Sequence, residues 1–500
     1  MLSADFKKCL EDVFCPEDAG KVLAALECPP SVSVRMNPSK WIADEGKLPK
    51  IAGSNAVGMV PWNGWGYFLE KRPVFTLDPL IHAGVYYVQD SSAMFVGYVF
   101  RQMLGRMLKD GSLPQWRNLR VLDLCAAPGG KTTDLAASLR ELTGDRFILV
   151  SNEVMKSRIG TLADNVALWG DPNVVVTSAD PAAFANLNGF FDIVLADVPC
   201  SGEGMFRKDI EAAEQWSAET VALCASRQRR ILADVWPALA PGGLMIYSTC
   251  TFNRAENDGN VGWCAEELGG DIIKADCPYE GPVQTKHGFV LAPGLVPGEG
   301  QYCAVIRKHA GGDAAIFRTD AFENLTAVDT KNCRARKICK NGNNNHIRAN
   351  SPLPEEELSK MFTKSVSLKN KNELIVAIPI QIETDLKVIE NSLRPVTSGI
   401  AVGMVKANRL IPSPDLALST ILSQNAFPDA ELDKKAALEF LHRDCIRLNN
   451  SPLGYMTVSY RSHRLGFVKN IGNRCNNLHP MSRRIIMNVN YETNLLDKRE

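Results

Sequence analysis

Short apolar runs alternate with longer segments of helical character between residues 120 and 308. The runs are RVLDLC (120–125), FILVSNE (147–153), NVVVTSAD (173–180), FFDIVLADVPC (190–200), GGLMIYSTC (242–250) and QYCAVIRK (301–308). The segments between them include TTDLAASLRELTG and SRQRRILADVWPAL. Apolar strands that alternate with helices are typical of a mostly parallel sheet covered on both faces. We predict a Rossmann-like, doubly wound α/β domain over 106–310, which binds its ligands at the carboxyl ends of the strands.

The rest of the chain divides into four further segments. Residues 1–105 mix short helix and strand signals with loop sequences such as NPSK and PWNGWG, which predicts a small α+β domain. Residues 311–351 are a predicted basic linker, because positions 331–350 hold six Lys or Arg and no acid. We expect mixed α/β structure over 352–425. The alternation in YMTVSYRSHRLGFVKNIGNRCNN predicts a β-rich domain over 426–500.

Composition indicates a globular protein of several domains. The chain has 500 residues, of which 45% are apolar and 22% charged, and its formal net charge is zero. Any attraction to nucleic acid must therefore come from local patches. No apolar run approaches the roughly 20 residues that span a bilayer, and the first residues do not resemble a secretory signal. We predict a cytoplasmic protein with no membrane contact and no obligate protein partner.

The 14 cysteines are scattered and form no CxxC pair. In a reducing compartment this distribution predicts free thiols. Cys333, Cys339 and His346 come nearest to a metal-ligand cluster, but their spacing matches no zinc pattern. We predict no metal site.

A glycine-rich turn joins the run at 120–125 to the helical segment that follows. In CAAPGGK (125–131) the two glycines let the backbone turn sharply and approach a ligand. Glu153 ends the second strand, where nucleotide-binding folds place an acid for ribose hydroxyls, and Asp180 ends the third, in reach of an adenine amino group. An ordinary tight turn is the alternative. A phosphate-binding P-loop is disfavoured, since it requires glycine at position 125.

Two cysteines follow the fourth and fifth predicted strands. Asp197 and Cys200 lie in DVPCSGEGMFRKD (197–209), and Cys250 lies in YSTCTFNRAEND (247–258). Parallel strands end at one edge of a sheet, so both thiols should project into the ligand crevice. A lone buried cysteine is usually structural, whereas two at neighbouring strand ends favour a catalytic role.

Methylation of cytosine at C5 is a reaction that needs such a thiol. C5 is a poor nucleophile, so an enzyme first adds a nucleophile at C6, and a thiolate suits this step best. The adduct takes up a methyl group at C5, a base removes the C5 proton, and the thiolate leaves. Asp197 can hydrogen-bond the N3/N4 edge of the base and stabilise the adduct. The spacing leaves open which cysteine attacks, because DNA cytosine methylases use the thiol of a Pro-Cys pair.

The three motifs resemble, in order and spacing, those of the RsmF/NSUN-type RNA (cytosine-5) methyltransferases. SVSVRMNP (31–38) and YYVQDSSAMF (86–95) look like the N-terminal RNA-binding and pre-catalytic segments of that family. The tail, with RLIPSPDLALS and GFVKNIGNRCNN, is similar to the PUA-like extension of bacterial RsmF-like rRNA methyltransferases. The resemblance implies a class I methyltransferase domain with a seven-stranded sheet, placed between an N-terminal and a PUA-like RNA-binding domain.

The resemblance also implies roles for individual residues. S-adenosyl-L-methionine would be the methyl donor, Cys250 the nucleophile, and Cys200 a group that assists product release. Val198 stands where the family usually has Ala, which changes packing but removes no reactive group. The implied cofactor-binding residues are Cys125, Ala126, Ala127, Pro128, Gly129, Gly130, Lys131, Glu153, Asp180 and Asp197.

RNA contacts are predicted at basic side chains in three parts of the chain. The first set is Arg35, Lys131, Arg207 and Lys208. Phosphate contact and base stacking are also expected around Lys40, Arg72, Trp41, Trp62 and Trp65, although these aromatics would equally suit the core of a small domain. A further cluster on the tail comprises Arg461, Arg464, Lys469 and Arg474.

The RsmF-like tail favours small-subunit (16S) ribosomal RNA over transfer RNA as the substrate. Two other functions are weaker. DNA cytosine methylation would make Cys200 the nucleophile and leave Cys250 without a role. A catalytically inactive RNA-binding assembly factor would not require both cysteines, Asp197 and the cofactor turn.

Overall fold

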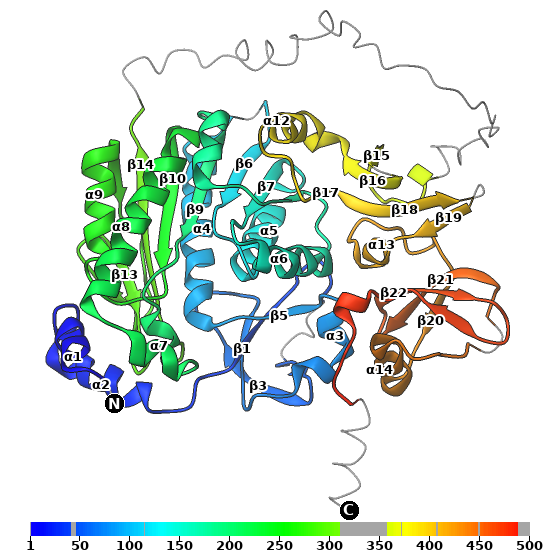
Figure 1. Ribbon diagram of the computed structural model, residues 1–500, viewed down its shortest axis with the longest axis horizontal. Coiled ribbons are helices and arrows are strands. Elements are labelled where there is room, and N and C mark those ends of the chain that lie inside the picture. The colour runs from blue at the N-terminus through cyan, green and yellow to red at the C-terminus, as the bar shows by residue number, and fades with distance from the viewer. Residues whose placement is uncertain are drawn as a thin grey trace, which may run out of the picture.

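A central sheet and three smaller sheets make up the described part of the protein, as seen in a computed structural model (Figure 1). In Figure 1 the N-terminal sheet lies below the central sheet and the C-terminal elements lie to one side of it. None of the described helices is both long and apolar enough to cross a bilayer. The structure describes residues 2–41, 47–114, 116–310, 358–371, 373–406, 409–448 and 451–488.

The central sheet contains every apolar run that the sequence predicts as a strand. Its strands are β6 (Leu119–Asp123), β7 (Phe147–Asn152), β8 (Val174–Thr177), β9 (Phe191–Asp197), β10 (Leu239–Thr249), β11 (Gly270–Ile273), β12 (Val283–Gln284), β13 (Gly288–Leu291), β14 (Gln301–Lys308) and β17 (Thr397–Ser398). Their order is β12-β13-β14-β10-β9-β6-β7-β8-β17, with β11 also paired to β14. Strands β10, β9, β6, β7 and β8 are parallel, and β14 is antiparallel to β10. The predicted doubly wound fold is confirmed.

The sheet is larger than the seven strands expected, with ten among the described residues. The seven are β8, β7, β6, β9, β10, β14 and β11. Strand β14 is long enough to pair with β11 along one half and with β13, which carries β12, along the other. Strand β17 is two residues of the C-terminal part, added to the edge at β8. The two-residue strands β12 and β17 have no apolar pattern of their own, so the sequence does not reveal them.

Helices cover both faces of the central sheet. Side chains of one strand alternate between the two faces, so Ile193 packs in one hydrophobic core and Val194 in the other. Both faces are dry, which is why the strands are continuously apolar. One face carries α4 (Ser91–Lys109), α5 (Gly130–Thr143) and α6 (Lys156–Trp169), and the other carries α8 (Ala218–Val235), α9 (Asp258–Leu268) and α12 (Glu383–Leu393).

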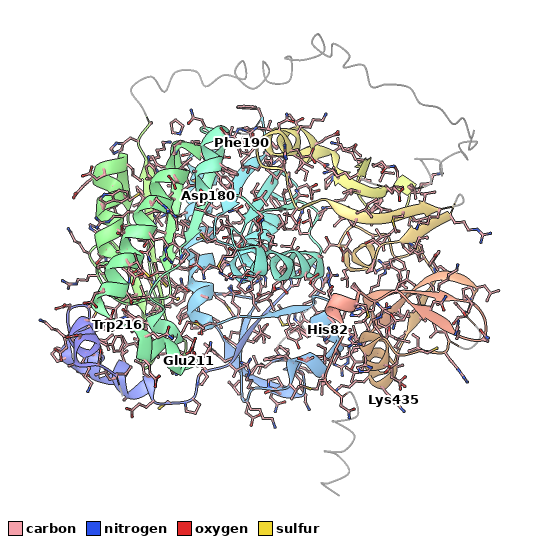
Figure 2. All side chains as sticks on the ribbon, viewed as in Figure 1. His82, Asp180, Phe190, Glu211, Trp216 and Lys435 are labelled. Atoms are coloured by element: carbon pink, nitrogen blue, oxygen red, sulfur yellow. The ribbon has the colours of Figure 1, made fainter. Side chains whose placement is uncertain are left out.

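The N-terminal part consists of a sheet and two detached helices. The sheet has the order β2 (Lys50–Ile51), β3 (Ser54–Met59), β4 (Gly66–Leu69), β1 (Ser33–Met36), β5 (Tyr86–Val88), with α3 (Pro79–His82) before β5. Helices α1 (Ala4–Glu11) and α2 (Pro16–Leu26) pack on the central domain, where the Phe6 ring centroid lies 5.4 Å from that of Trp216. Figure 2 labels Trp216 beside these helices. The predicted limit at residue 105 falls inside α4, which packs against α5 and β14.

The C-terminal part forms two four-stranded sheets. One has the order β15 (Val366–Lys371), β16 (Leu374–Pro379), β18 (Ile400–Lys406), β19 (Arg409–Pro412), and the other β20 (Asp429–Glu431), β21 (Gly454–Tyr460), β22 (His463–Asn470), β23 (Cys475–Asn477). Helices α13 (Pro414–Leu418) and α14 (Lys434–His442) accompany them. The last sheet shares one hydrophobic core with the N-terminal sheet, so these two sheets pack together.

Candidate active site

The two predicted thiols lie together at the carboxyl edge of the central sheet. Strands β9 and β10 are parallel neighbours in which Asp197 pairs with Ser248, so the loops that follow them begin side by side. Cys200 lies three residues after Asp197, and Cys250 lies two residues after Ser248. Their Sγ atoms are 3.1 Å apart, and both are free thiols. Strand register therefore joins two residues that are 50 positions apart in the chain.

The surroundings of the two thiols differ. The hydrogen bond with Cys250 raises the pKa of Cys200, and burial raises it further, so Cys200 keeps its proton at neutral pH. Burial lowers the pKa of Lys131. The negative charge of Asp197 and the hydrogen bond that Asp197 accepts from Lys131 outweigh this effect, and the charge of Cys250 adds to them, so the pKa of Lys131 is raised overall. Lys131 therefore stays a cation at neutral pH.

Asp197 is oriented by three donors. Lys131 Nζ is 2.8 Å from its Oδ2, Ser248 Oγ donates to its Oδ1, and Gln301 Nε2 donates to the same oxygen at 3.2 Å. Gln301 is 2% exposed and also donates to the carbonyl oxygen of Thr249 at 2.9 Å. The carboxylate is thus held at the strand end from which the Cys200 loop departs.

Two buried carboxylates, Glu203 and Glu256, tie the cysteine loops to each other. Glu203 follows Cys200 and accepts from the backbone N of Phe252 at 2.6 Å. Glu256 follows Cys250 and accepts from the backbone N of Ser201 at 3.1 Å, and burial raises its pKa. Sequence reasoning missed both residues. The available signal was the single glutamate inside each cysteine motif.

The glycine-rich turn adopts a backbone conformation that requires glycine. Gly129 has a φ of 111° and precedes α5 as its N-cap. A Cβ at Gly129 would lie 3.3 Å from Leu162 Cδ1, so a side chain would be strained and crowded. Arg35 Nη2 donates to the carbonyl oxygen of Gly130 at 3.1 Å. The N-terminal sheet therefore helps to fix the turn.

Glu153 and Asp180 follow β7 and β8, where the sequence predicts them, but differ in exposure. Glu153 is 3% exposed, its Oε1 accepts from the backbone N of Met155 at 2.8 Å, and its Oε2 lies 3.4 Å from Arg158 Nη1. Asp180 is exposed (Figure 2) and caps the short helix η2 (Pro181–Leu187) through a 3.0 Å hydrogen bond. Both carboxylates lie at the carboxyl edge of the sheet, on the side of the glycine-rich turn.

The predicted RNA contact of Arg35 is wrong. The side chain is fully buried, and it donates to Gln89 Oε1 at 2.7 Å and to Thr133 Oγ1 at 2.6 Å. Its guanidinium carbon lies 4.7 Å from the ring centroid of Trp169. Hydrogen bonds and ring stacking compensate for burial of the charge, so Arg35 joins the N-terminal sheet to α5.

The predicted RNA contact of Arg207 is wrong for a similar reason. Its side chain is 7% exposed and forms a bidentate pair with Glu299, in which both N···O distances are 2.9 Å. Lys208 is 36% exposed and lies 3.8 Å from Glu299, so its predicted RNA contact is sterically open. Lys131 is 16% exposed and is paired to Asp197.

Aromatic and basic residues of the N-terminal sheet serve mainly in packing. Trp62 is 3% exposed, and its Nε1 donates to the carbonyl oxygen of Ser91 at 2.7 Å. Lys40 Nζ donates to the carbonyl oxygen of Leu168 at 2.7 Å, and burial lowers the pKa of Lys40 to about 7. Arg72 is exposed. The alternative that these aromatics fill a small core fits Trp62.

No group of three metal-ligating side chains occurs within the described ranges. Cys333, Cys339 and His346 lie outside the described residues.

Family models match three successive parts of the chain. The "N-terminal domain of 16S rRNA methyltransferase RsmF" matches residues 2–91, "16S rRNA methyltransferase RsmB/F" matches 113–269, and "Methyltransferase RsmF PUA domain" matches 427–485. All three matched descriptions name RsmF methyltransferases. The match over 113–269 includes the glycine-rich turn and both cysteine motifs, and the resemblance stated from these motifs is confirmed.

Curated relatives extend the similarity along the length of the chain. The "Ribosomal RNA small subunit methyltransferase F" of Escherichia fergusonii is 29% identical over 474 residues, which cover 92% of this chain and 91% of the relative. The protein of the same name from Cronobacter sakazakii is 32% identical over 327 residues, or 63% of this chain and 65% of the relative. The second match thus spans just under two thirds of that relative.

A solved structure has a similar fold. The crystal structure of PH0851 aligns with a TM-score of 0.53 and 21% sequence identity, over 61% of this chain and 66% of that one. At this identity the likeness concerns the fold alone, and it agrees with a class I methyltransferase domain.

Proposed function

We propose that this protein methylates C5 of a cytosine in RNA, using S-adenosyl-L-methionine as the methyl donor and Cys250 as the nucleophile. One observation carries the proposal: two free thiols 3.1 Å apart, with a half-buried ammonium-carboxylate pair formed by Lys131 and Asp197 beside them. Addition to a pyrimidine requires a thiolate, a cation that stabilises it and a group that binds the base edge. These side chains supply all three.

The groups at the carboxyl edge of the sheet suit S-adenosyl-L-methionine. The turn at 125–131 offers main-chain groups to the cofactor, and the positive φ of Gly129 shapes this turn. Glu153 would accept hydrogen bonds from the ribose hydroxyls, and Asp180 would accept one from the adenine amino group. Lys131 and Asp197 would face the methionine end. The bound cofactor supplies an electrophilic methyl group.

The attack begins with Cys250 as a thiolate. Its sulfur forms a bond to C6, and the electron pair of the C5=C6 double bond is displaced into the ring. Asp197 hydrogen-bonds the N3/N4 edge and stabilises the protonated adduct. C5 then has enamine character and would take up the methyl group as the bond between that methyl and the sulfonium sulfur breaks, which would leave S-adenosyl-L-homocysteine.

Release requires loss of the C5 proton to a base and cleavage of the bond between sulfur and C6. The electrons of the C–H bond restore the C5=C6 double bond, and the sulfur leaves as a thiolate. Cys200 retains its proton because its pKa is raised by the hydrogen bond with Cys250 and by burial. It can therefore donate a hydrogen bond to the departing sulfur, which lowers the barrier to elimination.

Small-subunit ribosomal RNA in the cytoplasm is the proposed substrate. Both relatives are named for this RNA, and two of the matched family descriptions name 16S rRNA. On the last sheet, Arg461 and Arg474 are exposed and would add phosphate contacts. Arg464 is less available, since it donates to the carbonyl oxygen of Ser423 at 2.8 Å. Transfer RNA is the alternative substrate.

The test is methyl transfer with tritiated cofactor to three nucleic acids: transcripts of small-subunit ribosomal RNA, transfer RNA and duplex DNA. After nuclease digestion, we expect the label in 5-methylcytidine from the ribosomal transcript. Label in transfer RNA alone would make transfer RNA the substrate in place of ribosomal RNA. Label in DNA would indicate a DNA cytosine methylase, in which Cys200 is the nucleophile. RNA binding without any methyl transfer would indicate the other alternative, a catalytically inactive RNA-binding assembly factor.

Substitution of Glu153 tests the cofactor site. Glu153→Ala should weaken S-adenosyl-L-methionine binding by roughly 1–3 kcal/mol, because buried ribose hydrogen bonds lose their acceptor. Glu153→Gln, which keeps an oxygen for the backbone N of Met155, should lose less. Titration calorimetry measures both, and the exposed Glu141→Ala serves as the control. Unchanged affinity in a folded Glu153→Ala variant would contradict the ribose assignment.

A further inference from the structure

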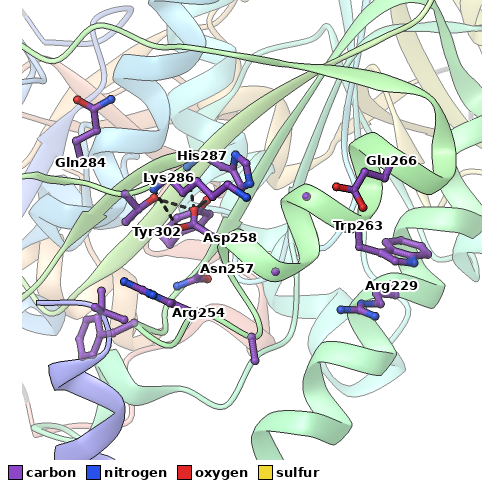
Figure 3. A pocket seen from close by; sticks show the side chains of 16 residues that line it. Arg229, Arg254, Asn257, Asp258, Trp263, Glu266, Gln284, Lys286, His287 and Tyr302 are labelled. Carbon is purple, nitrogen blue, oxygen red and sulfur yellow. Dashed lines mark hydrogen bonds between the residues drawn. The ribbon is translucent and has the colours of Figure 1, made fainter.

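A pocket of about 810 Å³ lies beside the loop that follows Cys250 (Figure 3). Its walls are the loop at 252–257, one side of α9, the hairpin at 284–287, and single residues of α8, of β14 and of the segment after α1. The volume falls within the range of ligand sites. None of the steps described above uses this pocket.

The pocket adjoins the thiols through both the sheet and the loop. Tyr302, in its wall, pairs across β10 and β14 with Thr249, the residue before Cys250. Phe252 and Arg254, also in the wall, belong to the loop that Cys250 begins. A strand of RNA that places a cytosine at Cys250 therefore has its neighbouring nucleotides within reach of this pocket.

Two cations in the wall have no carboxylate partner. Arg254 and Lys286 are both exposed, and neither forms an ion pair within 4.0 Å with any described residue. Figure 3 shows them in the wall on either side of Asp258. A third cation, Arg229, has its guanidinium carbon 5.5 Å from the ring centroid of Trp263. Exposed unpaired cations grouped around a concave surface favour an anionic ligand.

Two acids also line the pocket, and they differ. Glu266 is exposed and lies beside Trp263, away from Arg254 and Lys286 (Figure 3), whereas Asp258 is engaged within the fold. Asp258 accepts from Thr285 Oγ1 and Tyr302 Oη at 2.8 Å each, from the backbone N of His287 at 3.1 Å and from that of Lys286 at 3.2 Å (Figure 3). These bonds hold the hairpin against the start of α9, and with it the backbone that carries Lys286. The N-terminus of α9 adds a partial positive charge on the same side.

We propose that this pocket binds backbone phosphates of the RNA adjacent to the target cytidine, through Arg254 and Lys286. The proposal rests on the proposed function, since the position beside Cys250 is what selects RNA over another anion. The Arg254 guanidinium suits bidentate contact with a phosphate, and Lys286 acts as a point charge. Neither contact reads a base, so the pocket positions the strand and confers no sequence preference.

The test compares full-length wild-type protein with the double variant Arg254→Gln/Lys286→Gln. The probe is a fluorescein-labelled transcript of small-subunit ribosomal RNA, followed by anisotropy over a range of salt concentrations. We expect Kd to rise by on the order of tenfold, and the slope of log K against log salt to fall in magnitude by about 1.5. In methyl transfer, KM should rise by a similar factor while kcat stays within about twofold.

The matched control is Lys109→Gln/Arg146→Gln. It removes two exposed cations from the amino-terminal edge of the sheet, where Arg146 precedes β7, and should bind RNA as the wild type does. Equal RNA affinity and salt slope in the two double variants would overturn the proposal. Unchanged RNA affinity with lost binding of a poly-glutamate peptide would assign the pocket to an acidic protein and overturn it as well.

Failure of the proposed function can be distinguished from failure of the pocket assignment. If wild-type protein binds the transcript but transfers no methyl group, the enzymatic proposal fails, and the anisotropy comparison still decides the role of the pocket. If transfer proceeds and the pocket variant retains the wild-type Kd, KM and salt slope, only the pocket assignment fails.

Discussion

The Cys250→Ala variant should lose methyl transfer by at least about 10⁴-fold and should leave no covalent RNA adduct, because no nucleophile remains to attack C6. Its half-buried side chain is small and lies just beyond the end of β10, so the fold should survive the change. Cofactor binding should persist, since the turn at 125–131 is untouched.

The Cys200→Ala variant should fail at a later step. Attack and methylation remain available to Cys250, but the departing sulfur loses the thiol that lies 3.1 Å away. Elimination should stall, and the enzyme should accumulate as a methylated RNA complex that resists denaturation. Multiple turnover should fall sharply, while a single methyl transfer per enzyme should still occur.

Denaturing gel electrophoresis with methyl-labelled cofactor and structured RNA separates the two outcomes, and thermal melting checks the folding of each variant. The exposed Cys28→Ala is the matched control and should behave as the wild type. An adduct in the Cys250 variant and none in the Cys200 variant would reverse the assignment. Adducts in neither variant would argue against the covalent mechanism.

Asp197→Asn should reduce kcat by about 10²–10³-fold, the range observed when a preorganised polar group that stabilises a transition state is removed. The substitution deletes the charge that faces Lys131 Nζ at 2.8 Å. The new amide N–H₂ also replaces one of the two oxygens of Asp197. It then faces a side chain that already donates: Lys131 in one orientation of the amide, or Ser248 and Gln301 in the other. Both the contact with the base edge and the orientation of the residue are therefore disturbed.

Single-turnover kinetics measures this loss, and cofactor titration separates it from weaker binding. Asp276→Asn, at an aspartate whose side chain is 77% exposed, provides the control and should retain wild-type kcat. A kcat within threefold of wild type in a folded Asp197→Asn variant would remove Asp197 from the chemistry.

Local sequence pattern was sufficient to locate the central strands and the motifs between them. A strand covered on both faces must be apolar along its whole length, and this property is visible within a window of a few residues. The glycine-rich turn is equally local, because the positive φ of Gly129 is required by its own backbone. Short strands such as β12 and β17 escaped prediction because two residues carry no periodicity.

Which charges are available to a ligand was not visible in any such window. Arg35 and Arg207 have the composition of RNA contacts, yet their partners Gln89 and Glu299 lie 54 and 92 positions away. Whether a cationic side chain is exposed to a ligand or paired inside the fold depends on the side chains that pack around it. Those side chains come from distant parts of the chain. Arg254 is also an arginine, but in contrast to Arg35 and Arg207 its side chain remains exposed.

The distance between the thiols has the same origin. The motifs identify Cys200 and Cys250 individually, and a parallel sheet predicts that they share an edge. Their 3.1 Å separation follows from the register that pairs Asp197 with Ser248 and from the crossed hydrogen bonds of Glu203 and Glu256. Register is set by hydrogen bonds between strands that are remote in sequence, so it exists only once the sheet has formed.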